Sequence, residues 1–119
     1  MKVQVRNLVN ISIIDSTGDV DLYSSPKLRD ALLAEIRADG PCVLVNMSEV
    51  AYIDSSGIAT LVEGLQLSRQ TKTRFGLFGL RPNARSVLGL ARLDKVFVIF
   101  GNEAEALEKI GSVEPFAGV

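Results

Sequence analysis

The stretch that decides the fold is Tyr52-Ile53-Asp54-Ser55-Ser56-Gly57-Ile58-Ala59-Thr60-Leu61. Before it lies an apolar run at residues 41–46, which is typical of a short buried strand. After it, apolar residues recur at the i, i+3, i+4 and i+7 spacing of one helix face: Ile58, Leu61, Val62 and Leu65. The tetrapeptide Asp54-Ser55-Ser56-Gly57 therefore lies where a loop becomes a helix.

The first turn of a helix has free backbone N–H groups, which leaves two interpretations of this tetrapeptide. Asp and Ser are preferred N-cap residues, because their side-chain oxygens accept hydrogen bonds from those N–H groups. The same donors, together with the positive end of the helix dipole, also favour a phosphate group at this place. The four residues alone indicate either an ordinary N-cap or a phosphorylatable serine at an exposed helix tip.

The composition is that of one soluble globular domain. The chain has 119 residues, of which 47% are hydrophobic and 23% charged, and its formal net charge is −1. Acidic and basic residues are interspersed, so no direct binding to nucleic acid is expected. No apolar run is long enough for membrane insertion, and residues 1–6 do not form a signal peptide. We therefore expect a cytoplasmic protein, which also suits the lone Cys42.

The residue types that are missing exclude most catalytic chemistry. The chain has no histidine and a single cysteine, so it has neither a Ser-His-Asp triad nor a histidine or thiolate metal site. It also lacks the glycine-rich phosphate loops of nucleotide-binding proteins. Asp19 and Asp21 have the spacing that opens a calcium loop, but the glycine and glutamate that must follow are missing. We expect no catalytic residue, no metal and no cofactor, and we interpret the protein as a non-enzyme.

The remaining pattern predicts an α/β fold. Residues 2–6 and 9–17 alternate as two strands, and a turn at Asn7-Leu8 would join them as a hairpin. Helix signals and apolar strands then alternate along the chain. The helices are expected to begin near Ser24, Ser55, Pro82 and Asn102, and the strands lie near 41–46, 73–79 and 96–100. This order predicts one domain at 1–111, with an N-terminal hairpin, a mostly parallel central sheet and about four helices, and a tail at 112–119.

Three stretches resemble the STAS domain family. Gly18-Asp19-Val20-Asp21 is similar to the Gly-Glu-Leu-Asp step after the second strand of these domains. Residues 50–57 resemble the hallmark of the family, and residues 92–97 resemble its last join between helix and strand. The resemblance runs from about residue 8 to about residue 110, nearly the whole chain, and it implies the STAS fold.

The resemblance also implies a function, because STAS domains include the anti-sigma factor antagonists of bacteria. In these proteins the serine directly after the aspartate of the motif is phosphorylated by an anti-sigma factor that is itself a serine kinase. Carried over by position, that serine is Ser55. The unphosphorylated form binds the kinase and frees a sigma factor, and a phosphatase resets the switch. The implied partners are an anti-sigma factor/serine kinase and a cognate phosphatase.

We expect the partner-binding surface around the motif. Its predicted residues are Asp19, Asp21, Asp54, Ser55, Ser56, Gly57 and Ile58. A phosphate there adds about −1.5 to −2 charge to an already acidic face, so binding is lost, while free N–H groups at the helix start accommodate the new oxygens. Ser56 either shares the cap or lies beneath the helix tip. Gly57 either keeps the first turn free of bulk or permits close packing of helix and sheet.

One departure from the family pattern leaves a second function open. Antagonists often have Gly-Leu-Gly after the two serines, whereas this chain has Gly57-Ile58-Ala59. Some stand-alone STAS proteins are small subunits of lipid-transporting ABC complexes, in which they bind an ATPase. The alternative is therefore a constitutive assembly subunit that binds a transporter ATPase without a phospho-switch.

Overall fold

The computed structural model describes residues 1–38 and 40–113 of the chain. In this part of the chain five strands form one sheet: β1 (Lys2–Leu8), β2 (Ile11–Thr17), β3 (Cys42–Glu49), β4 (Arg74–Phe78) and β5 (Ile99–Phe100). Its helices are α1 (Ser25–Arg37), α2 (Ser55–Thr71), α3 (Pro82–Leu90) and α4 (Glu103–Lys109), with a 3-10 turn, η1 (Ile110–Ser112), after α4. None of the helices described here is both long and apolar enough to cross a membrane.

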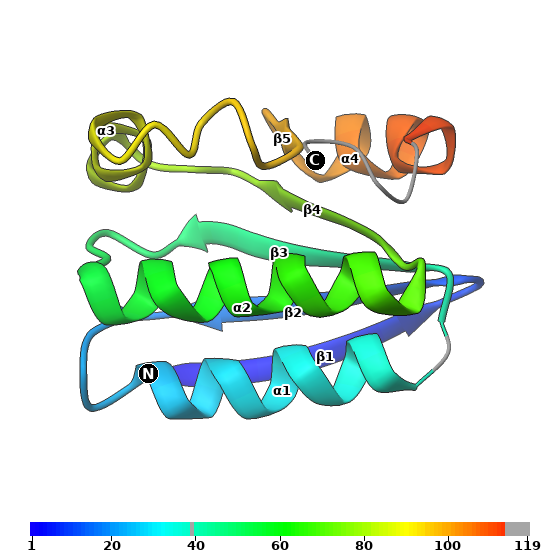
Figure 1. Cartoon of the computed structure of the whole chain (residues 1–119), viewed down its shortest axis with the longest axis horizontal. Coiled ribbons are helices and arrows are strands. Elements are labelled where there is room, and N and C mark those ends of the chain that lie inside the picture. The colour runs from blue at the N-terminus through cyan, green and yellow to red at the C-terminus, as the bar shows by residue number, and fades with distance from the viewer. Residues whose placement is uncertain (39, 114–119) are drawn as a thin grey trace.

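The strands lie side by side in chain order, β1-β2-β3-β4-β5. β1 and β2 are antiparallel, whereas β2, β3, β4 and β5 run parallel to one another. Parallel neighbours need a crossover connection, and α1, α2 and α3 each lie in one of these connections. Figure 1 shows α1 and α2 side by side in front of the sheet. The predicted α/β domain with an N-terminal hairpin, a mostly parallel sheet and four helices is confirmed.

Fully buried aliphatic side chains cover both faces of the central strands. Ile14, Val43 and Val45 belong to the core on the side of α1 and α2. Their neighbours Ile13 and Leu44 point to the opposite face, because successive strand residues alternate, and there they pack with residues of α4. Each such side chain contributes about 1.5–3 kcal/mol by leaving water. The central strands are thus packed on both of their faces.

The hairpin turn lies later than the sequence predicted. β1 continues to Leu8, and the turn is formed by Val9 and Asn10 instead of Asn7 and Leu8. Asn10 has a φ of 64°, in the left-handed region that asparagine tolerates better than most residues. Asn7 lies within the strand, where its side chain accepts a hydrogen bond from Ser12. The prediction was wrong because both asparagines give the same turn signal in the sequence.

The last strand is shorter than predicted. Only Ile99–Phe100 pairs with β4, at one edge of the sheet. The backbone N–H groups of Val96 and Phe97 donate to the Leu93 carbonyl and form a turn. Phe97 is still buried in the core, so the apolar run reflects burial and not strand length. Of the predicted tail, residues 114–119 lie outside the described residues.

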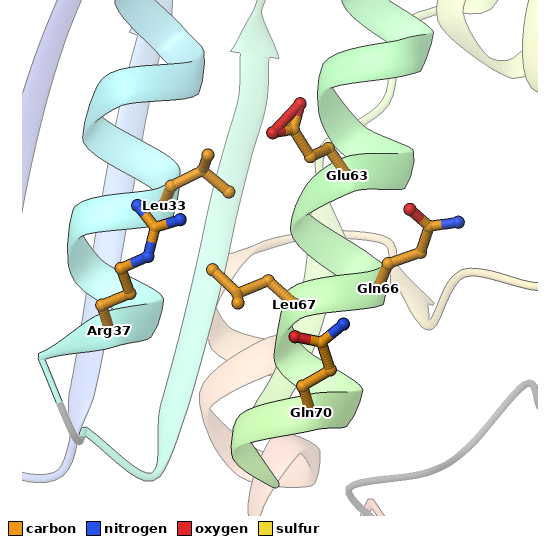
Figure 2. Close-up of a pocket in the computed structure, with 6 residues that line it drawn as sticks. All are labelled: Leu33, Arg37, Glu63, Gln66, Leu67 and Gln70. Atoms are coloured by element: carbon orange, nitrogen blue, oxygen red, sulfur yellow. The ribbon is translucent and has the colours of Figure 1, made fainter.

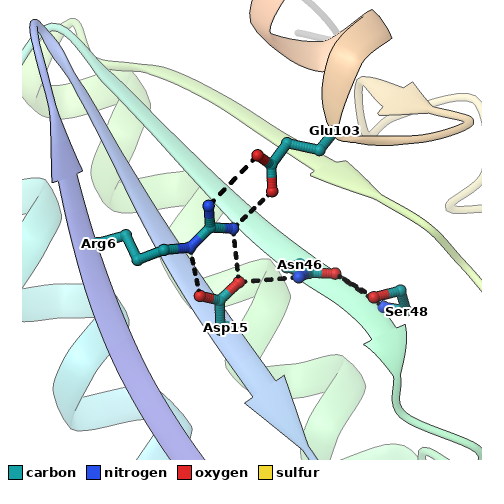
Figure 3. Close-up of polar contacts among 5 residues, drawn as sticks. All are labelled: Arg6, Asp15, Asn46, Ser48 and Glu103. Atoms are coloured by element: carbon teal, nitrogen blue, oxygen red, sulfur yellow. Dashed lines mark hydrogen bonds and ion pairs between the residues drawn. The ribbon is translucent and has the colours of Figure 1, made fainter.

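An ion-pair network joins the edge of the sheet to α4 (Figure 3). Nε of Arg6 on β1 lies 2.5 Å from Oδ2 of Asp15 on β2, and its Nη2 lies 2.5 Å from Oε1 of Glu103 on α4. Asn46 donates a hydrogen bond of 2.8 Å to Asp15 and accepts one of 2.7 Å from the hydroxyl of Ser48. The hydrogen bond from Arg6 is the main cause that lowers the pKa of Asp15.

We expect this network to make stability depend on pH in the acid range. Because the folded pKa of Asp15 is lowered, its contribution is complete above the unfolded value of about 3.9 and is lost as the pH falls through the folded value. The side chain of Arg6 is 40% exposed and screened by solvent, so the expected loss is only about 1 kcal/mol. Urea unfolding at pH 6 and at pH 3 measures this loss as the difference between the wild type and a variant that lacks the Asp15 carboxylate.

Asp15→Asn removes the titrating group and is expected to lose about 1 kcal/mol less than the wild type over this range. Asp94→Asn is the matched control, because Asp94 is exposed and makes no ion pair within the described residues. Between pH 6 and pH 3, Asp94→Asn should lose as much unfolding free energy as the wild type does. An equal loss in Asp15→Asn and the wild type would contradict the assignment to Asp15.

Candidate functional site

Two loops that follow neighbouring strands meet at the start of α2. The loop after β2 and the loop after β3 pair through a single parallel bridge between Val20 and Ile53. The N–H of Val20 donates to the Tyr52 carbonyl at 2.9 Å, and the N–H of Asp54 donates to the Val20 carbonyl at 3.0 Å. Parallel strands place their carboxyl ends at the same edge of a sheet, which is why these loops come together. The motif therefore begins from a fixed backbone.

Asp54 is the N-cap of α2. Its Oδ1 accepts hydrogen bonds from the N–H of Ser56 at 2.9 Å and from the N–H of Gly57 at 3.3 Å. It also accepts from the hydroxyl of Ser56 at 2.5 Å. These hydrogen bonds, that of the Ser56 hydroxyl first, hold the pKa of Asp54 below its ordinary value. The carboxylate is thus ionised near neutral pH and already occupies two donors of the first helical turn.

Ser55 and Ser56 have different surroundings. Ser55 is the first residue of α2, its side chain is exposed, and its hydroxyl makes no hydrogen bond within residues 1–38 and 40–113. Ser56 is partly buried, and its hydroxyl donates to the capping carboxylate of Asp54. The cap that the sequence left open is therefore Asp54, and the Ser56 hydroxyl supports it by donating to the capping carboxylate. Ser55 is left with a hydroxyl that is free to meet another molecule.

Gly57 and Ile58 lie behind this surface. Both are buried, and Ile58 belongs to the hydrophobic core with 9% of its surface exposed. A Cβ on Gly57 would lie 2.5 Å from Cγ1 of Ile53 and 2.7 Å from Cγ1 of Val20. The absence of a side chain at Gly57 thus lets α2 approach the bridge between the two loops. We exclude Gly57 and Ile58 from the surface that a partner contacts.

The two acidic residues of the first loop differ in what they do. The Oδ1 of Asp21 accepts from the backbone N–H groups of Tyr23 and Ser24, both at 3.0 Å, so this carboxylate shapes the loop before α1. The hydrogen bond from the N–H of Ser24 is the main cause that lowers the pKa of Asp21, whereas the charge of Asp54 raises this pKa. Asp19 has an exposed side chain. The structure therefore brings Asp19, Asp21 and Asp54 to one end of the molecule.

Sequence reasoning missed three exposed apolar side chains on the same two loops. Leu22 is 68% exposed and Tyr23 is 90% exposed, in the loop that carries Asp19 and Asp21. Tyr52, in the loop before Ser55, is 47% exposed. Large apolar groups on polar loops are the signal that was available in the sequence, because such loops connect elements over the surface. Together with the carboxylates they give this end of the molecule both apolar and acidic character.

A separate hollow of about 150 Å³ lies between α1 and α2 (Figure 2). Leu33 and Leu67 point toward each other between the two helices, whereas Gln66 points away. Glu63 at its rim is paired with Arg29 across the helices, with Nη2 and Oε2 2.6 Å apart. No group of three His, Cys, Asp or Glu suited to a metal ion occurs in the described part of the chain. This hollow lies apart from the loops that meet at the start of α2 and shares none of their carboxylates.

Comparisons with known proteins show the family and the fold of the chain. The family model of the STAS domain matches residues 2–106. An anti-sigma-B factor antagonist of Listeria monocytogenes is 27% identical over 105 residues, which covers 88% of this chain and 91% of the relative. An anti-sigma factor antagonist from Mycobacterium paratuberculosis has a similar crystal structure, with a TM-score of 0.82 and 23% identity over 92% of this chain and 93% of that one. The phosphorylated form of Bacillus SpoIIAA has a TM-score of 0.73 and 18% identity, over 92% of this chain and 99% of that one.

Proposed function

The chain belongs to the STAS domain family, and from this premise we propose that it is a partner-switching anti-sigma factor antagonist of the cytoplasm. In its unphosphorylated form it binds an anti-sigma factor that is also a serine kinase, and so relieves the inhibition of a sigma factor. The kinase phosphorylates Ser55 and the complex separates. A cognate phosphatase then returns the protein to its binding form.

One observation carries the proposal: the exposed hydroxyl of Ser55 has no role in the helix that it begins. Asp54 supplies the cap, so the oxygen of Ser55 is available as a nucleophile toward a bound nucleotide. In the transfer, Oγ forms a bond to the γ-phosphorus of ATP, the bond to the β-phosphate oxygen breaks, and ADP leaves. A base of the kinase takes the hydroxyl proton. The role of this chain is to present the serine on a rigid tip.

The occupied cap changes how a phosphate at Ser55 would act. The sequence led us to expect that free N–H groups at the helix start would accommodate the phosphate. The N–H groups of Ser56 and Gly57 already donate to Asp54, so they are not free for it. The phosphate instead adds about −1.5 to −2 charge next to the Asp54 carboxylate and near Asp21. The new charge falls on a surface that is already acidic. A partner that fits the neutral hydroxyl then meets both extra bulk and uncompensated charge.

The surface around Ser55 also indicates what the partner must offer. Leu22, Tyr23 and Tyr52 present apolar area, and aromatic side chains of this kind anchor many interfaces. Asp19 adds an exposed carboxylate beside them. We infer an apolar recess in the kinase that receives these side chains, with basic groups at its rim. The complementary charge would speed association and fix the orientation of the complex.

Capture of partners from a lysate of the native host tests the proposal. The baits are the wild type and Ser55→Ala, each incubated with and without ATP before the retained proteins and the mass of the bait are determined. The proposal expects both baits to retain a kinase, and only the wild type to gain a phosphate and release that kinase when ATP is present. A transporter ATPase retained equally by both baits, with no phosphate on either, would contradict the switch and indicate the assembly subunit.

A further inference from the structure

Asn83, in the first turn of α3, makes a contact with the motif that the proposed function does not use. Its Oδ1 accepts a hydrogen bond of 2.9 Å from the backbone N–H of Ile53. Ile53 is only 1% exposed, and a buried backbone N–H needs a partner. Asn83 thus connects α3 to the segment that leads into α2, across a wide gap in the sequence.

This contact supplies the acceptor for the N–H of Ile53, which has no backbone acceptor among the described residues. On one side, the segment at 52–54 is bonded to the backbone of Val20. Successive N–H groups of an extended segment point to opposite sides, so the N–H of Ile53 faces away from Val20. On that side β4 has already ended at Phe78. The carboxamide of Asn83 takes the place of the missing strand.

We propose that Asn83 is a positioning residue for Ser55. It holds the 52–54 segment from the side opposite to Val20, and Ser55 follows this segment directly. Without the carboxamide, the segment keeps hydrogen bonds on one side only, and the buried N–H of Ile53 loses its partner. The hydroxyl of Ser55 is then presented in a range of positions instead of one. The functional consequence of this inference rests on the proposed phosphorylation of Ser55, whereas the structural one does not.

Three variants test the inference. Asn83→Ala removes the acceptor, and Asn83→Asp restores it, because a carboxylate oxygen also accepts from an N–H. Ser86→Ala is the matched control, since Ser86 is exposed on the same helix. The first measurement is amide hydrogen exchange by NMR. We expect Asn83→Ala to speed exchange at Ile53 and Asp54 by about tenfold relative to the core strands, with near-normal exchange in the other two variants.

The second measurement is phosphate transfer to Ser55 by the kinase that the wild-type bait retains. We expect kcat/KM to fall about fivefold to tenfold in Asn83→Ala and to recover in Asn83→Asp, because a misplaced acceptor lowers the fraction of productive complexes. Unchanged exchange at Ile53, or no recovery with aspartate, would overturn the positioning role. If the wild type itself is never phosphorylated, the proposed function fails, while the exchange data still decide whether Asn83 holds the segment.

Discussion

Replacing Ser55 with aspartate is expected to weaken binding of the captured anti-sigma kinase by about 30-fold or more. Loss of a matched polar contact within an interface costs about 2–5 kcal/mol, and each 1.4 kcal/mol is a factor of ten in affinity. The new carboxylate lies next to the carboxylate of Asp54, on the face that already carries Asp19 and Asp21. The midpoint of thermal unfolding should move by no more than about 2 °C, because an acidic residue in the first turn suits the helix dipole.

Isothermal titration calorimetry of the purified pair measures this effect, and the thermal midpoint is recorded on the same samples. Ser86→Asp is the matched control, because it places the same charge on an exposed position of α3. It should bind within about twofold of the wild type. If Ser55→Asp binds the kinase as tightly as Ser86→Asp, the charge at Ser55 is not what separates the partners.

Gly57→Ala is expected to lower the free energy of unfolding by about 2 kcal/mol, the usual cost of overpacking a core site. The added methyl group would lie 2.5 Å from Ile53 and 2.7 Å from Val20, closer than carbon atoms approach in proteins. Both neighbours are β-branched and held by the bridge between the loops, so they cannot turn away easily. The strain therefore falls on the bridge and on the first turn of α2.

Gly89→Ala provides the opposite case in the same molecule. Gly89 lies in α3, and a Cβ added there would meet nothing within 4 Å. Alanine is the better helix former by about 1 kcal/mol, so this variant should be more stable than the wild type by about 0.5–1 kcal/mol. Urea unfolding of both variants measures the contrast. Equal effects of alanine at the two positions would mean that helix propensity, and not the contact at the bridge, decides the outcome at Gly57.

The helix starts could be predicted because their signals are local. Pro26 lies in the first turn of α1, Asp54 caps α2, and Pro82 is the first residue of α3. At α4, which was expected to begin near Asn102, the side chain of Asn102 accepts a hydrogen bond from the N–H of Glu105 at 2.9 Å. The carboxylate of Glu105 returns to the N–H of Gly101, one residue earlier than in the regular capping box.

Features that depend on distant residues could not be read from the sequence. The network of Arg6, Asp15 and Glu103 requires both the register of the hairpin and the position of α4. In the same way, the acceptor for Ile53 comes from α3, and an isolated asparagine after a proline carries no sign of that partner. Periodicity finds elements and their buried faces, but the contacts between elements follow from how the sheet is assembled.

The bridge between Val20 and Ile53 makes the start of α2 a conformational epitope. The segment that leads into Ser55 is held by the backbone of Val20, in the first quarter of the chain. The carboxylates beside Ser55 come from both loops. A linear peptide cut around the serine contains the motif but neither Val20 nor Asp21. A molecule that recognises the assembled surface therefore recognises only chains that have completed their tertiary structure, and nascent or damaged copies of the protein cannot compete for it.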